Sequence, residues 1–135
     1  MADIVLTGPV LSQIKEVVES TLISAGVHTA LVIDDAGNIV ANCGDGKSSF
    51  DLLSLAALAA ANFGATSQMA KLIGEDDFSL LFHKGKNESI HFAKIGTDFI
   101  LISIFSDDVS LGLVRLRVSQ LSKTIAKIFE DNKDQ

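Results

Sequence analysis

Hydrophobic residues recur along the chain at two different spacings, and these spacings predict the secondary structure. Residues 10–22 and 111–128 carry apolar side chains three and four positions apart, the spacing of a helix with one buried face. Five shorter segments are rich in β-branched and aromatic residues: 28–34, 39–43, 78–84, 88–95 and 99–106. Short clusters of turn residues separate the first two of these segments from each other, and similar clusters separate the last three from one another. We therefore expect antiparallel strands.

Residues 52–74 form a third helical segment, which is apolar on nearly every side. Ser48 followed by Asp51 predicts its start, as a variant of the capping box, and Gly74 predicts its end. The apolar run from Leu52 is interrupted at Asn62, well short of the ~20 residues that a membrane span needs. A helix of this kind outside a membrane is buried on more than one side, so we expect it to contact its own sheet and a second surface.

The order of these segments, αββαβββα, predicts an α+β fold of the three-layer type. The strand at 99–105 is apolar at every position except Ser103, which is typical of a strand covered on both faces. We therefore expect a five-stranded antiparallel sheet with the helix at 52–74 on one face and the other two helices on the opposite face. The length favours one domain over residues 1–135, with an ordered core from about residue 8 to about residue 130.

Composition limits the classes of partner. Seventeen acidic against eleven basic side chains give a net charge of −6, which disfavours binding to nucleic acid and to anionic lipid surfaces. The N-terminus has no secretory signal pattern, and the single cysteine, Cys43, cannot form an internal disulfide, so we expect a cytoplasmic protein. A protein or a small molecule is the expected partner, with no membrane insertion.

The middle helix has two apolar faces when its residues are placed at ~100° intervals. One stripe is assigned to the sheet: Leu52, Leu55, Ala59, Phe63, Thr66, Ala70 and Ile73. The other face carries small residues four positions apart, which leave a groove for a second helix. Packing under a loop of the same chain is the alternative to a protein interface. The predicted dimer and partner interface consists of Ala57, Ala60, Ala61, Gly64, Ala65, Gln68, Lys71 and Leu72.

Four stretches of the chain, in this order, resemble the Roadblock family. They are GVHTALVIDDAGNIVA, SLAALAAANFGATSQMAKLIGE, LLFHKGKNESIHFAKIG and SDDVSLGLVRLRV, within roughly residues 10 to 125. The resemblance is strongest to the bacterial members that regulate Ras-like small GTPases. It implies the αββαβββα fold and a homodimer in which the second helices lie side by side and an outer strand pairs with its mate. It also implies a non-enzymatic regulator that binds a Ras-like small GTPase and stimulates its GTP hydrolysis, without a cofactor.

Two alternatives remain open. The first is a phosphate-binding loop, because the segment before the middle helix ends in Gly46-Lys47-Ser48. Against it, Ala41 replaces the first glycine of that motif, Asp45 places a carboxylate where phosphates bind, and the preceding strand belongs to a hairpin. The second alternative is a profilin-like or sensory domain that holds a small ligand beneath the middle helix. This helix offers such a ligand few polar groups, namely Ser54, Asn62, Ser67 and Gln68.

The ionisable residues show no catalytic or metal-binding pattern. His28, His83 and His91 lack cysteine or carboxylate neighbours at metal-ligand spacing. We expect structural or solvent-facing roles for them, and His83 and His91 to be surface residues of one hairpin. Cys43 ends an apolar strand and is interpreted as a small core residue.

The two arginines, Arg115 and Arg117, are candidates for an arginine finger acting on a GTPase. Both lie inside the third predicted helix, about 200° apart around its axis, so they cannot both face one ligand. We expect them to face solvent or to form ion pairs at the sheet edge, and we expect the regulator to act by binding and reshaping its GTPase.

Overall fold

The computed structural model describes residues 6–44 and 51–132 of the chain. The described elements follow the predicted order αββαβββα, with one short 3₁₀ turn added after the first helix. Their bounds are α1 Gly8–Thr21, η1 Ile23–Ala25, β1 Thr29–Asp34, β2 Ile39–Gly44, α2 Leu52–Leu72, β3 Leu81–Lys84, β4 Glu88–Ile95, β5 Phe99–Ser106 and α3 Leu111–Asp131.

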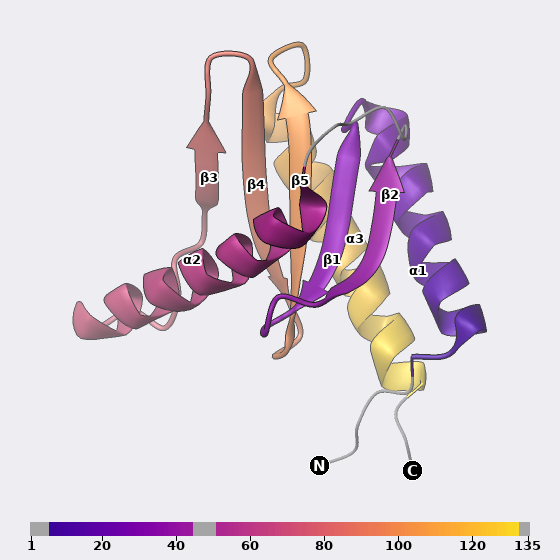
Figure 1. Cartoon of the computed structure of the whole chain (residues 1–135), viewed down its shortest axis with the longest axis horizontal. Helices are drawn as coiled ribbons and strands as arrows, with labels where there is room; N and C mark the ends of the chain where they lie inside the picture. The colour runs from indigo at the N-terminus through magenta and orange to yellow at the C-terminus, as the bar shows by residue number, and fades with distance from the viewer. Residues whose placement is uncertain (1–5, 45–50, 133–135) are drawn as a thin grey trace.

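The five strands form one antiparallel sheet in the order β2-β1-β5-β4-β3. The apolar strand β5 lies at its centre, where neighbours on both sides pair with it and helices cover both faces. Figure 1 shows α2 on one face of the sheet and α1 with α3 on the other. The predicted three-layer α+β fold is therefore confirmed.

Each face of the sheet has its own hydrophobic core, because side chains alternate between the faces along a strand. On the side of α1 and α3, Ile14 and Leu121 pack with Leu101 of β5, and all three are almost completely buried. On the side of α2, Ile102 of β5 packs with Phe63. The helical spacing in α1 and α3 therefore identified the buried stripes correctly.

Residues typical of helix ends cap the first and third helices. Thr7 accepts a hydrogen bond from the backbone N–H of Val10, and Ser110 accepts one from that of Leu113. The helical stretch that begins at Gly8 ends in a 3₁₀ turn, after which Gly26 has the left-handed conformation of a C-cap (φ 110°).

The start of α2 differs from the prediction. Its N-cap is Asp51, whose carboxylate accepts hydrogen bonds from the backbone N–H and the hydroxyl of Ser54, at 3.1 and 2.7 Å. The predicted cap, Ser48, lies outside the described residues. The strand predicted from residue 78 is also shorter than expected, since β3 begins only at Leu81. Residues 73–80 are all exposed, whereas a strand of this sheet would bury the side chains on at least one of its faces.

Candidate partner-binding surface

α2 rests on the sheet through a narrow row of mostly small side chains. These buried residues are Ala56, Ala59, Ala60, Phe63 and Ala70. Alanine side chains let the helix backbone approach the sheet closely, and Phe63 provides the one large apolar contact of the row. The stripe predicted to face the sheet is therefore right for its central residues and incomplete, because it omitted Ala56.

The end of the predicted sheet-facing stripe is wrong. Ile73 was expected on the sheet, but 69% of its surface is exposed. α2 ends at Leu72, and Ile73 is its C-cap residue. Figure 1 shows the reason: α2 runs obliquely across the sheet and its C-terminal end projects past the edge formed by β3.

Seven of the eight residues predicted for the interface are exposed in the structure. They are Ala57, Ala61, Gly64, Ala65, Gln68, Lys71 and Leu72. The eighth, Ala60, is only 9% exposed and belongs to the core on the α2 side of the sheet. Successive residues of a helix point about 100° apart around its axis. Ala61 therefore faces outward while its neighbour Ala60 faces the sheet.

Large apolar side chains lie among these small residues, and the sequence interpretation named only one of them, Leu72. Leu58 is 69% exposed and Leu72 is 85% exposed. Lys71 is the only charged residue of α2. We define the α2 outer face by its exposed apolar and polar residues: Leu53, Ala57, Leu58, Ala61, Gly64, Ala65, Gln68, Met69 and Leu72. The helical spacing of Leu58, Ala65, Met69 and Leu72 in the sequence indicates that these four residues share one face of the helix.

Exposed apolar residues are concentrated in this part of the molecule. Among the described residues, nine large hydrophobic side chains are exposed, and seven of them lie between positions 53 and 80. They are Leu53, Leu58, Met69, Leu72, Ile73, Phe78 and Leu80. Exposed apolar side chains in this number are typical of the centre of a protein interface. The charged residues Glu75, Asp76 and Asp77, also exposed, lie between Ile73 and Phe78.

The edge strand β3 adjoins this surface. Among the described strands it pairs with β4 alone, so its other side presents backbone N–H and C=O groups that no described strand pairs with. An open edge of this kind can be extended by a strand of another molecule. The α2 outer face and the β3 edge therefore form two adjoining features suited to a protein partner.

A cavity of about 630 Å³ lies between the N-terminal half of α2 and the hairpin of β3 and β4. Leu55, Leu58, Ile90 and Ile104 form its apolar wall. Because Leu58 belongs to the α2 outer face as well, the cavity is continuous with that surface. This hollow is the place that a small ligand beneath α2 would occupy. Polar and charged residues border it as well, namely Asp51, Ser54, His83, Lys84 and Glu88.

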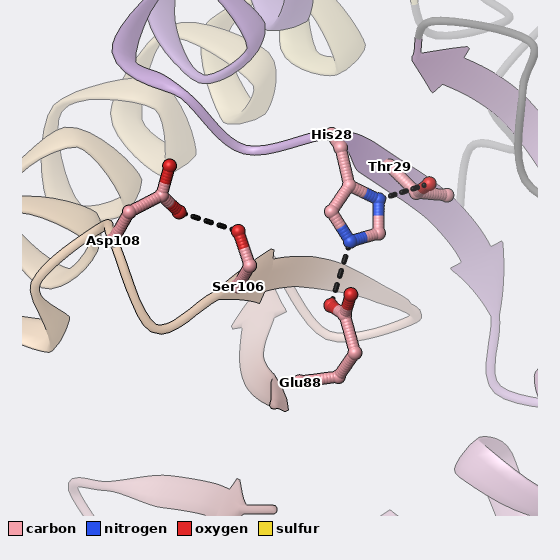
Figure 2. A network of polar contacts seen from close by, with 5 residues as sticks. All are labelled: His28, Thr29, Glu88, Ser106 and Asp108. Carbon is pink, nitrogen blue, oxygen red and sulfur yellow. Dashed lines mark hydrogen bonds and ion pairs between the residues drawn. The ribbon is translucent and has the colours of Figure 1, made fainter. Parts of the chain in front are cut away.

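A polar cluster joins the ends of three strands without forming a catalytic arrangement (Figure 2). The ring of His28 contacts Glu88 through Nε2 at 2.7 Å and Thr29 through Nδ1 at 2.9 Å. The hydroxyl of Ser106 donates to Asp108 rather than to the histidine. The only hydroxyl among these contacts of His28 is that of Thr29, its neighbour in the chain. The contact between His28 and Glu88 links the start of β1 to the start of β4 across the end of β5.

The other two histidines differ from each other. His83 is exposed, lies 3.3 Å from the side-chain nitrogen of Asn62 and contacts the ring of Phe92 edge-on. His91 was expected at the surface, but it is 5% exposed and lies on the face of β4 covered by α3. In the parts of the chain that the structure describes, no three histidine, cysteine or carboxylate side chains are grouped as metal ligands.

Cys43 is a core residue, as predicted. Its side chain is buried against α1, and burial, with the nearby charge of Glu19, raises the pKa of the thiol to about 11. The arginines only partly match the prediction. Arg115 is exposed and Arg117 is half-buried, but neither forms an ion pair with another described residue.

The candidate phosphate-binding loop, Gly46-Lys47-Ser48, lies outside the described residues. The strand before it, β2, pairs antiparallel with β1, as the hairpin prediction required. A phosphate-binding loop of the usual kind follows a parallel strand. In residues 6–44 and 51–132, no helix has the length and apolar character needed to cross a membrane.

Comparison with known proteins agrees with this architecture. The sequence model of the Roadblock/LC7 domain matches residues 13–105. Gliding protein MglB of Thermus thermophilus is 32% identical, with a TM-score of 0.86, and the match covers 97% of this chain and 98% of that one. Myxococcus xanthus MglB is 34% identical over 93% of each chain, with a TM-score of 0.85. An MglB with a tetrameric arrangement is 30% identical over 98% of each chain, with a TM-score of 0.88.

Proposed function

This chain belongs to the Roadblock/LC7 family, and from that premise we propose that it is a homodimeric, non-enzymatic regulator that binds a Ras-like small GTPase of the MglA type and stimulates its GTP hydrolysis. Its fold is that of an MglB-like Roadblock domain. The GTPase and the direction of its regulation come from the family resemblance. The chain's own residues provide the binding surface.

The observation that carries the proposal is the exposure of the α2 outer face. A helix in the middle of the chain presents Leu53, Leu58, Met69 and Leu72 to solvent while burying mainly alanines. Burying such side chains stabilises an interface by about 25 cal/mol per Å² of apolar surface. The reverse arrangement, large residues inward and alanines outward, would be expected of a helix that serves only its own core.

The dimer is supported by the geometry of the C-terminal half of α2. This half projects past β3, and Ile73 at its end is exposed where the sheet of this chain has ended. In the proposed dimer, a second copy pairs its β3 with this β3 and places its own sheet under the projecting helix. The same operation brings the two α2 helices side by side, so that one symmetric contact covers both features.

The GTPase would bind across the two α2 helices. Small residues at their centre, such as Ala61 and Gly64, allow the helices to approach closely. Gln68 and Lys71 lie nearer the C-terminal end and are polar, so they suit the rim of the interface with the partner. This division separates residues whose loss prevents dimerisation from residues whose loss weakens GTPase binding alone.

Binding of a purified MglA-type GTPase in its GTP-bound form tests the proposal. Lys71→Glu and Gln68→Ala should retain the dimer and weaken binding, with the effect of Lys71→Glu larger at low ionic strength because surface charges are then less screened. Lys123→Glu is the matched control, since Lys123 is an exposed lysine on α3, on the opposite face of the sheet. Equal binding by all three variants and the wild type would contradict the proposed surface.

The hydrolysis assay distinguishes two modes of stimulation. If the protein acts by binding and reshaping its GTPase, Arg115→Ala should stimulate hydrolysis like the wild type. Loss of stimulation in Arg115→Ala, with binding retained, would instead assign an arginine finger to α3.

A further inference from the structure

A second cavity lies at the edge of the sheet, apart from the α2 outer face, and is independent of the proposed function. It opens where β4 continues beyond the short strand β3. Leu81, the first residue of β3, pairs with Phe92, so Ala93 to Ile95 pair with β5 but have no described strand on the β3 side. α3 borders this part of β4 from one side and the segment before β3 from the other. The cavity between them measures about 340 Å³.

The walls of this cavity are of two kinds. Phe78, Leu81 and Phe92 provide apolar surface at one end. At the other end, α3 contributes Arg115, Ser119 and Ser122, and β4 contributes His91. A pocket with an apolar body and a few convergent polar groups is the usual form of a small-molecule site, and this volume lies at the small end of the range.

In the part of the chain that the structure describes, one buried polar group without a partner lines the polar end of the cavity, and a second lies next to it on the neighbouring strand. His91 is 5% exposed, and its Nδ1 has no hydrogen-bond partner within the described residues. Ser103, completely buried, is the residue paired with His91 on the neighbouring strand, and its hydroxyl also has no partner there. These are the two buried side-chain atoms in this condition among the described residues. Their occurrence side by side is unusual, because leaving a buried polar group unpaired costs about 1–3 kcal/mol.

The charge at the cavity is positive in a chain whose net charge is −6. Lys94 and Asp77 both line it and lie 3.9 Å apart, so their charges offset each other. Arg115 has no ion-pair partner among the described residues and leaves one positive charge. Burial, and secondarily the charge of Arg115, lowers the pKa of His91 to about 4, so the ring is neutral at pH 7 and can donate one N–H.

We propose that this cavity binds a small organic carboxylate, whose carboxylate is held by the guanidinium of Arg115, the ring of His91 and the hydroxyls of Ser119 and Ser122, and whose apolar body packs against Phe78 and Phe92. The arginine provides the planar pair of donors that a carboxylate matches. The aromatic wall selects an organic acid over an inorganic anion. The carboxylate of Asp77 at the rim disfavours a second negative charge.

Nuclear magnetic resonance titration of the whole chain with benzoate tests this site. Benzoate should cause saturable shifts at the amides of β4 and α3 around His91 and Ser119. Benzamide has the same ring without the charge and should bind about tenfold more weakly or not at all, because charge-assisted hydrogen bonds to Arg115 are lost. Inorganic phosphate has the charge without the ring and should compete poorly.

Two arginine variants serve as a matched pair. Arg115→Gln should weaken benzoate binding about tenfold. Arg117→Gln removes the same charge from the same helix at a position that does not line the cavity, and should leave binding unchanged. Both positions tolerate a polar side chain, so the fold is retained.

Four results would overturn the proposal. Equal binding of benzoate and benzamide would show a purely apolar hollow, and equal competition by phosphate would show an unspecific anion site. Benzoate binding unaffected by Arg115→Gln, or absent up to its solubility limit, would show that the polar end holds only water. Because the titration uses this chain alone, its result is independent of whether a GTPase binds at α2.

Discussion

At the scale of single residues, the sheet face under α1 and α3 has a buried polar pair, His91 and Ser103, within a mostly apolar core. Both residues were visible in the sequence as interruptions of apolar strands. Their burial makes the protonation of His91 costly, because a charged ring would lose its hydration. The pKa of this side chain is about 4 in the folded state and near its ordinary value of 6.5 in the unfolded chain.

His91 should therefore make folding depend on pH. Between pH 6.5 and pH 4 the unfolded chain binds a proton at this residue that the folded chain does not, so the free energy of unfolding falls as pH falls. The full contribution is present above pH 6.5, and its loss amounts to about 1–3 kcal/mol, the lower value allowing for solvent screening. Urea unfolding of the wild type and His91→Gln at pH 7 and pH 4.5 measures it. A parallel pH dependence in both proteins would show that His91 does not contribute.

Cys43 should react slowly in the folded protein. Burial of the thiol raises its pKa to about 11, and the thiolate is the species that attacks alkylating reagents. We expect iodoacetamide at pH 8 to label unfolded protein within minutes and native protein at a rate set by unfolding. Mass spectrometry of the quenched reaction checks this, and rapid native labelling would contradict the buried position.

At the scale of elements, the contact between the β1–β2 hairpin and α2 depends on one glycine. Gly37 has a φ of 92°, in the left-handed region, and a Cβ at this position would lie 3.0 Å from the Cα of Ala57. A side chain here must therefore both adopt an unfavourable backbone conformation and displace the helix that carries the α2 outer face.

Gly37→Ala should lower the free energy of unfolding by about 1–3 kcal/mol. Gly112→Ala is the control: Gly112 lies in the first turn of α3, its φ is not positive, and an added Cβ meets no atom within 4 Å. This second variant should be neutral or stabilising by up to about 1 kcal/mol. Chemical denaturation of both variants compares them, and equal stability would show that the hairpin contact is dispensable.

At the scale of the whole molecule, the exposed apolar surface and the open strand edge predict self-association. Sedimentation equilibrium should give about twice the chain mass of 14.3 kDa at micromolar concentration. Ala61→Arg should yield monomers, because a charged side chain between close-packed helices either separates them or is buried unpaired. A wild-type monomer at these concentrations would contradict the dimer, and a dimeric Ala61→Arg would move its contact away from the centre of α2.

The sequence by itself determined the elements whose signals are local. The bounds of β4 and β5 were predicted to the residue, since strand alternation and the turn residues between them are properties of neighbouring positions. The caps at Thr7 and Ser110 follow from hydrogen bonds that span three residues. The two-sided burial of β5 was also predicted, because a strand that is apolar at successive positions, here at all from Phe99 to Phe105 except Ser103, has no side that suits water.

Only the tertiary structure decided how α2 is turned about its axis and where it leaves the sheet. An amphipathic helix specifies its buried face, as α3 does, but α2 is apolar all round and its pattern does not distinguish neighbouring orientations. The burial of Ala60 and the exposure of Leu58 and Ile73 depend on where the strands lie beneath the helix. The burial of His91 likewise depends on α3, which begins some twenty residues later in the chain and covers β4. The sequence of β4 itself contains no pattern that predicts this cover.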